Sequence, residues 1–452
     1  MMTIDALAAI VGAGNAFGPD AVEPRYLDDE TGGAAGRPVG LVRPAGVEQV
    51  AAVLRHCHAA GQPVVVQGGR TGMTRGGLPR DGELILSLER MAAIEAIDSD
   101  AGLMTVGAGC VLEAAQQAAA DAGWRLAVDI GARGSCTIGG MIATNAGGTQ
   151  VLRYGMMRDQ VLGLEAVLAD GTIISSLGAM LKNNTGYDLK QFFIGSEGTL
   201  GIVTRAVLRL RPPAIGRQTA LCAVADYAAA VRLLARLERA MPGQLSAYEL
   251  MWSDFFGAAC VASGQGYPFD AAHELVVLVE TESGDDEALA AALEESFADG
   301  TVRDALIAQS ERDYQRFWRY RDAIGELVGA MAVVEPFDVS APIGAIGGLV
   351  TDLRARLARE VPGSRPICFG HIADGNLHLA LELAEEAQRP VAEAIVYDAV
   401  RAAGGSVSAE HGIGILKRAW LGHSRSAAEI AMMRTIRAAL DPKGILNRGR
   451  VF

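Results

Sequence analysis

Apolar and polar positions follow helix and strand periods in turn from the start of the chain. Residues 47–57 place apolar side chains at helical spacing, between an extended run at 38–44 and a β-branched run at 63–67. This order predicts a strand, a helix and a second strand, after a short helix at 4–11. The glycine-rich stretch at 68–77 that follows is not typical of a helix start, so we expect a loop there.

Strands and helices continue to alternate up to Pro212-Pro213. The strand expected at 161–168 turns back at Asp170-Gly171 as a hairpin. The other elements expected in this region are strands at 103–106 and 206–210 and a helix at 111–122. Because Pro212-Pro213 breaks the pattern, we expect a first domain at 1–213, made of two α+β subdomains with a boundary near residue 95.

Beyond the prolines, acidic helices alternate with further strands. The helices expected there lie at 227–239, 287–297, 311–328, 346–360 and 429–440, and the strands at 274–279 and 332–339. We assign 214–405 to a second domain and 406–452 to a C-terminal segment. The fold class expected for the whole chain is α+β.

Two histidines flank a turn sequence in the second domain. Asp374-Gly375 is a two-residue hairpin signal, and the residues on both sides alternate as strands do. In a hairpin closed by these two residues, His371 stands directly opposite His378. Both imidazoles then share one face, and the leucines of 377–381 share the core face. Directly opposed side chains have Cβ atoms about 4.5–5.5 Å apart, so two ring nitrogens can reach one ion.

The dipeptide Glu410-His411 extends this group, which then holds three of the seven histidines of the chain. With Glu410 as a third ligand, His371 and His378 make a three-ligand metal site with open positions. A strand histidine is more often a hydrogen-bonded structural residue. On spacing alone, both interpretations stay open.

Length, composition and charge exclude some classes of function. The 452 residues exceed one ordinary core, and the hydrophobic fraction of 50% is typical of a packed enzyme rather than a disordered chain. The formal net charge is −13, and no cluster of lysine and arginine with interleaved aromatic residues occurs. Nucleic acid is therefore not expected as a partner.

Cysteine spacing and hydropathy bear on the compartment. The six cysteines lie far apart without a Cys-x-x-Cys pair, which argues against a thiolate metal site and a disulfide framework. The N-terminus has no basic leader, and no stretch reaches the roughly 18 uncharged apolar residues of a membrane span. We expect a cytoplasmic protein with no transmembrane segment, and peripheral association with a membrane stays open.

Two glycine clusters of the first domain offer backbone N–H groups that no side chain shields. The first is the stretch 68–77, and the second, at 137–148, surrounds Thr144-Asn145 with glycine pairs. Two such clusters favour a dinucleotide over a flexible surface loop. Leu112 stands where the Rossmann fingerprint that could begin at Gly107 needs its third glycine, and no Walker sequence occurs, so nicotinamide and nucleotide hydrolysis are poorly supported.

Five motifs in fixed order carry a resemblance to a known family. They are Gly68–Gly77, Gly134–Gly148, Asn184–Lys190, Phe193–Gly201 and Leu446-Asn447. In order and spacing the chain resembles FAD-linked oxidoreductases of the vanillyl-alcohol-oxidase type over nearly its whole length. It is most similar to their D-2-hydroxyacid dehydrogenase branch, which includes D-2-hydroxyglutarate and D-lactate dehydrogenases.

The resemblance implies a two-part FAD-binding domain, a substrate cap from 214 to about 405, and a C-terminal segment that returns to the flavin. The first glycine loop would hold the diphosphate and the second cluster the isoalloxazine ring. The FAD-binding residues implied are Gly68, Gly69, Arg70, Thr71, Gly72, Ser135, Ile138, Gly139, Gly140, Thr144, Asn145, Gly148, Gly201, Val203 and Asn447. No histidine lies between His58 and His273, so we expect FAD to be bound non-covalently.

The resemblance also implies roles for the histidine group. His371, His378 and Glu410 would bind a divalent metal, with zinc as the expected ion, and His411 would be the catalytic base. The chemistry is coherent, because a metal lowers the pKa of the substrate hydroxyl and an imidazole takes the proton. Arg321 and Asn376 would bind the substrate, the arginine through its carboxylate.

The substrate pocket departs from the hydroxyglutarate enzymes at three positions. Gly325, Pro336 and Ala380 stand where those enzymes carry a threonine, a lysine and an asparagine. A second substrate carboxylate buried without partners would be costly. The difference favours a monocarboxylate such as D-lactate, or a bulkier D-2-hydroxy acid, over D-2-hydroxyglutarate.

We therefore expect FAD-dependent oxidation of a D-2-hydroxy acid to a 2-oxo acid. Electrons would pass to an electron-transfer flavoprotein, a quinone or a cytochrome rather than to oxygen, and the family leads us to expect a homodimer. Two alternatives stay open. One is a flavin alcohol oxidase of the same fold with structural histidines, and the other is a noncatalytic FAD-binding subunit for electron transfer.

Overall fold

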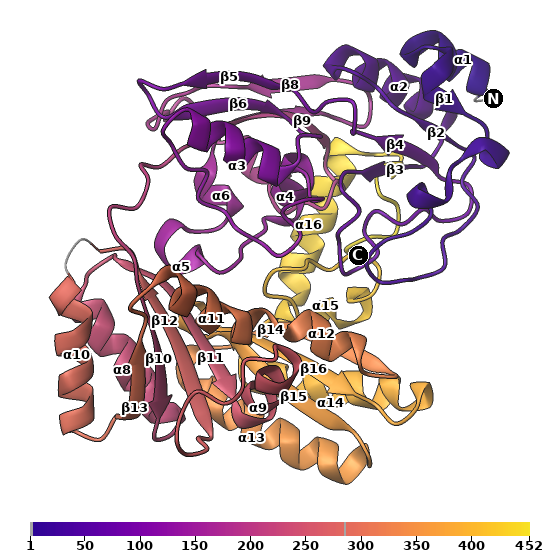
Figure 1. The fold of residues 1–452 in the computed structure, drawn as a ribbon. Coiled ribbons are helices and arrows are strands. Elements are labelled where there is room, and N and C mark those ends of the chain that lie inside the picture. The colour runs from indigo at the N-terminus through magenta and orange to yellow at the C-terminus, as the bar shows by residue number, and fades with distance from the viewer. Residues whose placement is uncertain (1–2, 284–285) are drawn as a thin grey trace. The chain divides into compact units, whose positions relative to one another are not determined.

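The chain folds into two compact units. The computed structural model describes residues 3–283 and 286–452. Figure 1 colours the chain from its N-terminus to its C-terminus. The first unit contains Met1–Gly148, Gly155–Pro213 and Glu410–Phe452, and the second contains Thr149–Tyr154 and Ala214–Ala409. The C-terminal segment therefore belongs to the same unit as the N-terminal sheets.

The first unit differs from the predicted first domain in two ways: it also holds Glu410–Phe452, and it lacks Thr149–Tyr154, which contains the short helix α5 (Val151–Tyr154). This helix packs in the second unit, where the Tyr154 hydroxyl donates to the carboxylate of Glu282 and Arg153 Nη1 donates to the Glu282 carbonyl at 3.1 Å. The second unit also continues to Ala409, whereas we expected the second domain to end at 405.

The predicted strand–helix–strand opening of the first unit is confirmed. It consists of β2 (Gly40–Val42), α2 (Val47–Ala60) and β3 (Val64–Gln67). Between the two strands lies β4 (Leu84–Ser87), which pairs in parallel with both. Helix α2 follows from its apolar stripe, whose residues Val50, Val53, Leu54 and Cys57 are all buried.

The other elements of this part are α1 (Ile4–Val11), which matches the predicted helix, and the edge strand β1 (Ala16–Phe17). The four strands are ordered β1-β2-β4-β3. Short 3₁₀ helices lie at η1 (Ala13–Asn15), η2 (Pro19–Ala21) and η3 (Pro24–Tyr26). Residues 68–77 form no helix or strand, as predicted.

A second, fully antiparallel sheet completes the first unit, with the strand order β5-β6-β9-β7-β8. Its strands are β5 (Ile94–Asp98), β6 (Leu103–Gly107), β7 (Val161–Val167), β8 (Ile173–Ser176) and β9 (Ile202–Arg209). The hairpin predicted at Asp170-Gly171 is confirmed as the β7–β8 pair. The helices are α3 (Leu112–Asp121), α4 (Ile138–Thr144), α6 (Met157–Gln160) and α7 (Lys190–Phe193).

The C-terminal tail lies along β3. It follows η6 (Arg418–Trp420), α15 (Leu421–Ser424) and α16 (Ala427–Leu440). Val64 N–H donates to the Ile445 carbonyl at 2.8 Å, and Asn447 N–H donates to the Val64 carbonyl at 2.9 Å. Arg450 is fully buried, where it pairs with Glu83 at 2.9 Å and donates to the Leu78 carbonyl at 2.6 Å. The tail is thus an integral part of the first unit.

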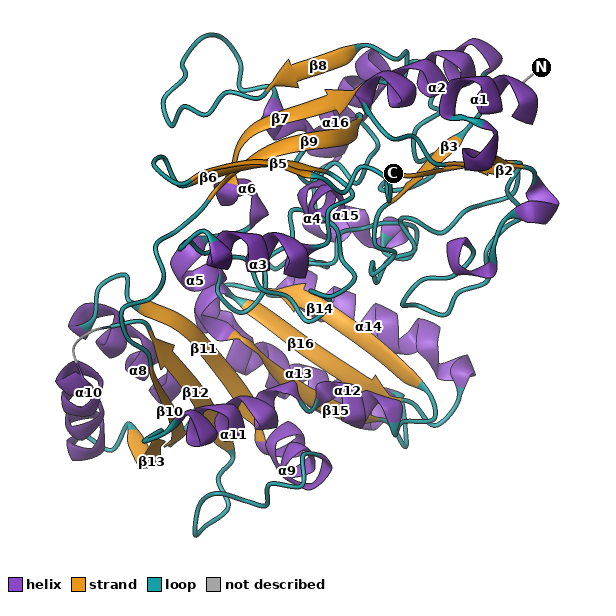
Figure 2. Cartoon of the chain, turned by 45° about the horizontal axis from the view of Figure 1, so that its top comes forward, coloured by secondary structure: helices purple, strands orange, loops and turns teal. Residues whose placement is uncertain are grey.

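The second unit is built on one antiparallel sheet, ordered β13-β10-β12-β11-β15-β16-β14 (Figure 2). Its strands are β10 (Gln218–Val224), β11 (Leu245–Trp252), β12 (Leu275–Thr281), β13 (Val302–Ile307), β14 (Val334–Ser340), β15 (Arg365–His371) and β16 (Asn376–Glu382). Its other helices are α8 (Tyr227–Ala240), α9 (Ser253–Ala262), α10 (Asp286–Ala298), α11 (Glu311–Asp322), α12 (Ile324–Gly329), α13 (Ile343–Glu360), α14 (Arg389–Ala402) and the short η5 (Glu386–Gln388).

Helices cover both faces of this sheet. Apolar residues of α9, α11 and α12 pack on one face with Phe369 and Ala380, while α8, α13 and α14 pack together over the other. The predicted helices at 227–239, 287–297, 346–360 and 429–440 are confirmed within a few residues. The single helix predicted at 311–328 is wrong, because Ala323, with ψ near 0°, ends α11 and starts α12. The apolar spacing continues from α11 into α12 and predicts one helix. Ala323 is fully buried in the core with residues of α9, so tertiary packing breaks the helix at this residue.

The register predicted for the histidine hairpin is also wrong. His378 pairs with Phe369 and not with His371. The reason is that residues 372–374 form a 3₁₀ turn, η4, followed by Gly375 at φ 84°, and Ile372 is fully buried instead of joining the ladder. The register is shifted by two residues, which leaves each side chain on its predicted face.

Candidate functional site

A cavity of about 650 Å³ lies in the first unit. Its walls come from three segments, 66–77, 130–147 and 197–203, together with Glu30, Leu88, Glu410, His411 and Asn447. Both glycine clusters therefore line one cavity. Its volume falls in the range of small-molecule and cofactor sites.

Glycine is needed at this cavity because backbone meets backbone. A Cβ on Gly69 would lie 2.1 Å from the Ser135 carbonyl oxygen, so the first glycine loop can touch the second cluster only without side chains. Gly72 and Gly76 instead have no atom within 4 Å of where a Cβ would be. Both positions leave open space beside the backbone in the cavity lining, as an elongated ligand with a diphosphate requires.

Two buried polar groups of the lining have no partner within the described part of the chain. These are the Thr137 hydroxyl, on a residue that is 6% exposed, and the side-chain oxygen of Gln67. An unpaired buried polar atom costs free energy that a bound polar ligand would recover. The chemistry of the lining thus fits a dinucleotide such as FAD.

Most of the predicted FAD-binding residues line this cavity. They are Gly68, Gly69, Arg70, Thr71, Gly72, Ser135, Gly139, Gly140, Thr144, Gly201, Val203 and Asn447. The other three do not. Ile138 lies in the hydrophobic core, Asn145 caps α4 and accepts the N–H of Arg158 at 2.9 Å, and Gly148 N–H donates to Glu410 Oε1 at 2.8 Å.

Several lining residues are not predicted by the sequence motifs, above all Glu30, Glu197 and the loop at 130–132. Glu30 lies outside both glycine clusters, so neither cluster marks it. Glu197 stands in a motif that was noticed only as a whole. Burial raises the pKa of Glu197, and the two backbone N–H groups that it accepts offset only part of this effect.

The backbone around His411 is held from two sides in the first unit. The Glu197 carboxylate accepts the N–H groups of Ile413 and Gly414, both at 2.7 Å, and the Thr74 hydroxyl donates to the His411 carbonyl at 3.3 Å. The half-buried His411 lines the cavity. Its position is therefore tied to the first glycine loop through Thr74.

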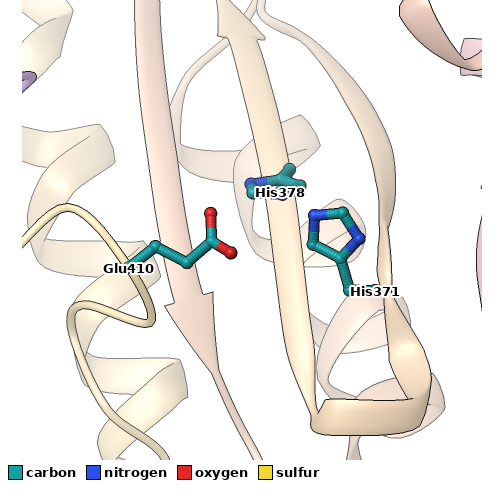
Figure 3. Close-up of side chains that lie close together, drawn as sticks. All are labelled: His371, His378 and Glu410. Carbon is teal, nitrogen blue, oxygen red and sulfur yellow. The ribbon is translucent and has the colours of Figure 1, made fainter. Parts of the chain in front are cut away.

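The two hairpin histidines, His371 and His378, share one face of the second unit's sheet, which we call the histidine face. Their ring centroids lie 5.1 Å apart, with the ring planes at 83°. Figure 3 shows His371 and His378 on neighbouring strands; it also draws Glu410, the first residue of the last segment of the first unit. Two imidazoles at this separation are suited to hold one metal ion, with a carboxylate as a further ligand type.

Each histidine is paired with a carboxylate on the strand that flanks the β15–β16 hairpin on that side. Glu249 of β11 pairs with His371, and Asp338 of β14 pairs with His378. Both carboxylates are buried, at 1% exposure. No sequence motif predicts either carboxylate, because strands outside the hairpin bring both residues there.

Arg321 of α11 completes this cluster. Its Nε donates to Glu249 Oε2 at 2.6 Å, and its guanidinium lies 4.7 Å from the centre of the Phe369 ring. Glu249 also contacts His371 Nδ1 through its other oxygen. Burial alone would raise the pKa of Glu249, but His371 and Arg321 lower it to about 2. The carboxylate is thus ionised and shared by a histidine and an arginine.

Asn376 begins β16 on the same face as His378. The residue is 3% exposed, and neither polar atom of its amide has a partner among residues 3–283 and 286–452. A buried amide with no partner is rare and marks a place where a ligand can bind. The proposed substrate residue Asn376 therefore has the free donor and acceptor that the role requires.

The three departures from the hydroxyglutarate pattern lie in different settings. Gly325 in α12 and Pro336 in β14 are exposed, and Ala380 is 4% exposed in an apolar cluster with Ile367 and Phe369. Ala380 pairs with Pro336, and it lies on the histidine face, as predicted. These positions carry no polar side chain.

Two family models together match most of the chain. A model described as FAD binding domain matches residues 38–176, and a model described as FAD linked oxidases, C-terminal domain, matches residues 216–451. The first match covers both glycine clusters, and the second covers the histidine face and most of the C-terminal tail.

Curated relatives match over nearly the whole chain. The mitochondrial D-2-hydroxyglutarate dehydrogenase of Bos taurus is 40% identical over 416 residues, covering 90% of this chain and 75% of the relative. The D-2-hydroxyglutarate dehydrogenase of Xanthomonas citri pv. viticola is 39% identical over 427 residues, covering 92% and 89%.

Solved structures share the fold at low sequence identity. A p-cresol methylhydroxylase with substrate bound aligns with a TM-score of 0.78 at 17% identity, covering 99% of this chain and 96% of that one. An alkyldihydroxyacetonephosphate synthase aligns with a TM-score of 0.74 at 16% identity, covering 98% and 84%. Within the described residues, no helix combines the length and hydropathy needed to cross a bilayer.

Proposed function

Because the chain belongs to the FAD-linked oxidoreductases of the vanillyl-alcohol-oxidase type, in their D-2-hydroxyacid dehydrogenase branch, we propose that it oxidises a D-2-hydroxy acid with a metal-assisted, histidine-based mechanism. The enzyme is an FAD-dependent D-2-hydroxyacid dehydrogenase. The expected α+β fold, with a two-part FAD-binding domain and a cap, is confirmed by the fold shared with the solved structures.

The residues divide the work of the reaction. Arg321 binds the substrate carboxylate through its guanidinium, and the Asn376 amide orients a polar group of the substrate. A ring nitrogen of His411 takes the proton of the 2-hydroxyl, while the hydrogen on Cα leaves with its electron pair, so that the C–O bond becomes the carbonyl of the 2-oxo acid. FAD, when bound in the glycine-lined cavity, supplies the two-electron acceptor for that hydride.

A divalent metal, proposed to be zinc, would be held by His371, His378 and Glu410. It would supply a Lewis acid that lowers the pKa of the substrate hydroxyl. What supports this is the donor set: two imidazoles 5.1 Å apart on one sheet face, and a carboxylate that follows the second unit directly in the chain.

One observation carries the proposal. The buried amide of Asn376 has no partner in the described chain, and it shares a sheet face with two imidazoles and a buried guanidinium that is already oriented. A face with these groups is suited to a small hydroxy acid and would be costly for the fold without one.

The test of the reaction is a panel of D- and L-2-hydroxy acids with an artificial electron acceptor. We expect turnover of D-isomers only. Since Ala380 and Pro336 offer no polar partner for a second carboxylate, we expect D-lactate or a bulkier D-2-hydroxy acid to have a higher kcat/KM than D-2-hydroxyglutarate. Turnover of L-isomers alone, or of neither, would refute the proposal.

Metal removal tests the second part of the mechanism. Chelation should abolish turnover while the flavin spectrum remains, and added zinc should restore it. Flavin-loaded enzyme that holds no metal and keeps its turnover in chelator would instead favour a flavin alcohol oxidase with structural histidines.

The base and the electron acceptor have their own readouts. A protonated imidazole cannot accept a proton, so activity should fall in acid; a flat pH–rate profile down to about pH 5 would argue for another base. We propose an acceptor other than oxygen, namely an electron-transfer flavoprotein, a quinone or a cytochrome. Stoichiometric peroxide formation would contradict it.

A further inference from the structure

Glu249 has no assigned role, yet it contacts two other groups of the histidine face. Its carboxylate lies at the middle of β11 and is 1% exposed. One oxygen contacts His371 Nδ1, and the other accepts from Arg321 Nε at 2.6 Å. A single side chain thus touches a proposed metal ligand and a proposed substrate ligand.

The contact with Nδ1 determines how His371 can act. When Nδ1–H donates to a carboxylate, the lone pair lies on Nε2, which is the nitrogen then available to a metal. A carboxylate in this position also fixes the rotation of the ring. Because Glu249 and His371 are directly paired residues of adjacent strands, the sheet itself sets this contact.

The contact with Nε determines how Arg321 can act. It engages Nε at the inner edge of the guanidinium, so the two terminal nitrogens can face other partners. One of them, Nη2, lies 3.4 Å from His371 Nε2. Phe369 covers one face of the guanidinium at 4.7 Å, so the group is held in one plane. The arginine and the metal-binding nitrogen therefore face a common point.

We infer that Glu249 is a positioning residue that orients His371 and Arg321 together, so that metal binding and recognition of the substrate carboxylate depend on one buried side chain. The inference rests on the proposed function of these two residues and adds the coupling between them. Asp338 provides the contrast, because it stands opposite His378, with 3.7 Å between Asp338 Oδ1 and His378 Nδ1.

The experiment uses the full-length, flavin-loaded enzyme and the variant Glu249→Gln, which keeps the size of the side chain and removes the charge. Glu280→Gln is the matched control. Glu280 is a buried carboxylate of the neighbouring strand β12 that accepts from Ser246 and Trp318 instead. Zinc affinity is measured by competition with a chromogenic chelator, KM and kcat with the best substrate of the panel, and folding by thermal melting.

For Glu249→Gln we expect a zinc affinity that is about 10–100-fold weaker. We also expect a KM that is roughly 10–100-fold higher, because the guanidinium loses its charged partner. Glu280→Gln should leave both values unchanged at a comparable loss of melting temperature. Asp338→Asn should weaken zinc binding and leave KM less affected than Glu249→Gln does.

Wild-type zinc affinity together with wild-type KM in Glu249→Gln would overturn the inference, as would equal changes in both glutamate variants. If Glu249→Gln does not fold, Glu249→Asp replaces it. That variant keeps the charge but is too short to reach both partners, and normal values for both measurements in it would equally overturn the inference.

Failure of the proposed metal site gives a different result. In that case the wild-type enzyme itself takes up no zinc, and KM alone decides on Glu249. A raised KM in Glu249→Gln, with Glu280→Gln unchanged, then supports its hold on Arg321, and an unchanged KM refutes it.

Discussion

The glycine-lined cavity and the histidine face prepare for ligands by opposite means. In the cavity, Gly69 meets Ser135 backbone to backbone, and Gly72 leaves open space beside the backbone. On the histidine face, buried ionised side chains such as Glu249 and Arg321 hold one another in place. The cavity is thus sensitive to added atoms, whereas the face is sensitive to lost charges.

The difference follows from what each region would bind. A dinucleotide is long and presents many similar oxygens, which a row of backbone donors can serve without side chains. A small hydroxy acid presents one carboxylate and one hydroxyl, so a few oriented side chains must supply the discrimination.

His411→Ala should have the largest effect, because His411 is the proposed base and the reaction requires a group that accepts the hydroxyl proton. Flavin reduction by substrate should slow by about 10²–10⁴-fold while flavin content stays unchanged. Anaerobic stopped-flow bleaching of the flavin measures it. His423→Ala is the control, since His423 packs against Trp420; equal rates in the two variants would remove His411 from its role as the base.

Arg321→Lys tests whether the face depends on geometry as well as charge. Lysine keeps the charge but cannot hold Glu249 and a substrate carboxylate with one planar group, so KM should rise roughly 10–100-fold with a smaller change in kcat. Steady-state kinetics measure this. Arg316→Lys, on the same helix and in contact with the Tyr320 hydroxyl, should keep the wild-type KM. The opposite ranking would contradict the assignment.

Two glycine variants separate the packing of the cavity from its binding role. Gly69→Ala forces an atom to within 2.1 Å of a carbonyl oxygen and should destabilise even the flavin-free protein, by about 1–3 kcal/mol. Gly72→Ala meets no protein atom within 4 Å, so it should weaken flavin retention alone. Urea unfolding and flavin release on dilution distinguish the two; flavin retention unaffected by Gly72→Ala would mean that the ligand does not approach this residue.

Glu165→Gln should have the smallest effect, and its sign depends on pH. Burial would raise the pKa of Glu165, but Arg205, which binds both carboxylate oxygens, and Thr204 lower it overall. Because the pKa of Glu165 is lower in the folded state, its ionisation stabilises the fold at pH values above its unfolded-state pKa of about 4.3. This stabilisation is lost as the pH falls through the folded-state pKa. The difference in unfolding free energy between wild type and variant should therefore shrink from about pH 7 to about pH 3. A constant difference would argue against a charge effect.

Local patterns were sufficient for much of the fold. Helix α2, the β7–β8 hairpin and the shared face of His371 and His378 all follow from periods of apolar residues and from turn sequences. The register of the hairpin could not be predicted from its turn sequence, because Ile372 is buried and the turn is four residues long. This turn packs against β11 and α13, and no local pattern shows that packing. The split of the helix at Ala323 has the same kind of cause.

The candidate site was also predictable only in part, because the fold brings together residues that are distant in the chain. Glycine clusters and a histidine pair can be read along the chain, but Glu249 reaches His371 across 122 positions, and neither neighbourhood marks the other. Glu30 belongs to the lining of the cavity in the same way. Residues that join a site through strand pairing or a long loop are specified by the whole fold, and no short motif carries them.

The tail along β3 has a consequence for biosynthesis. Val64 and Glu83 emerge early from the ribosome, but their partners Ile445, Asn447 and Arg450 are made only after the entire second unit. A nascent chain that carries both glycine clusters therefore still lacks the last wall of their cavity. Completion of this cavity therefore requires residues 445–450, and the second unit, continuous apart from one short helix, can fold before these residues are made.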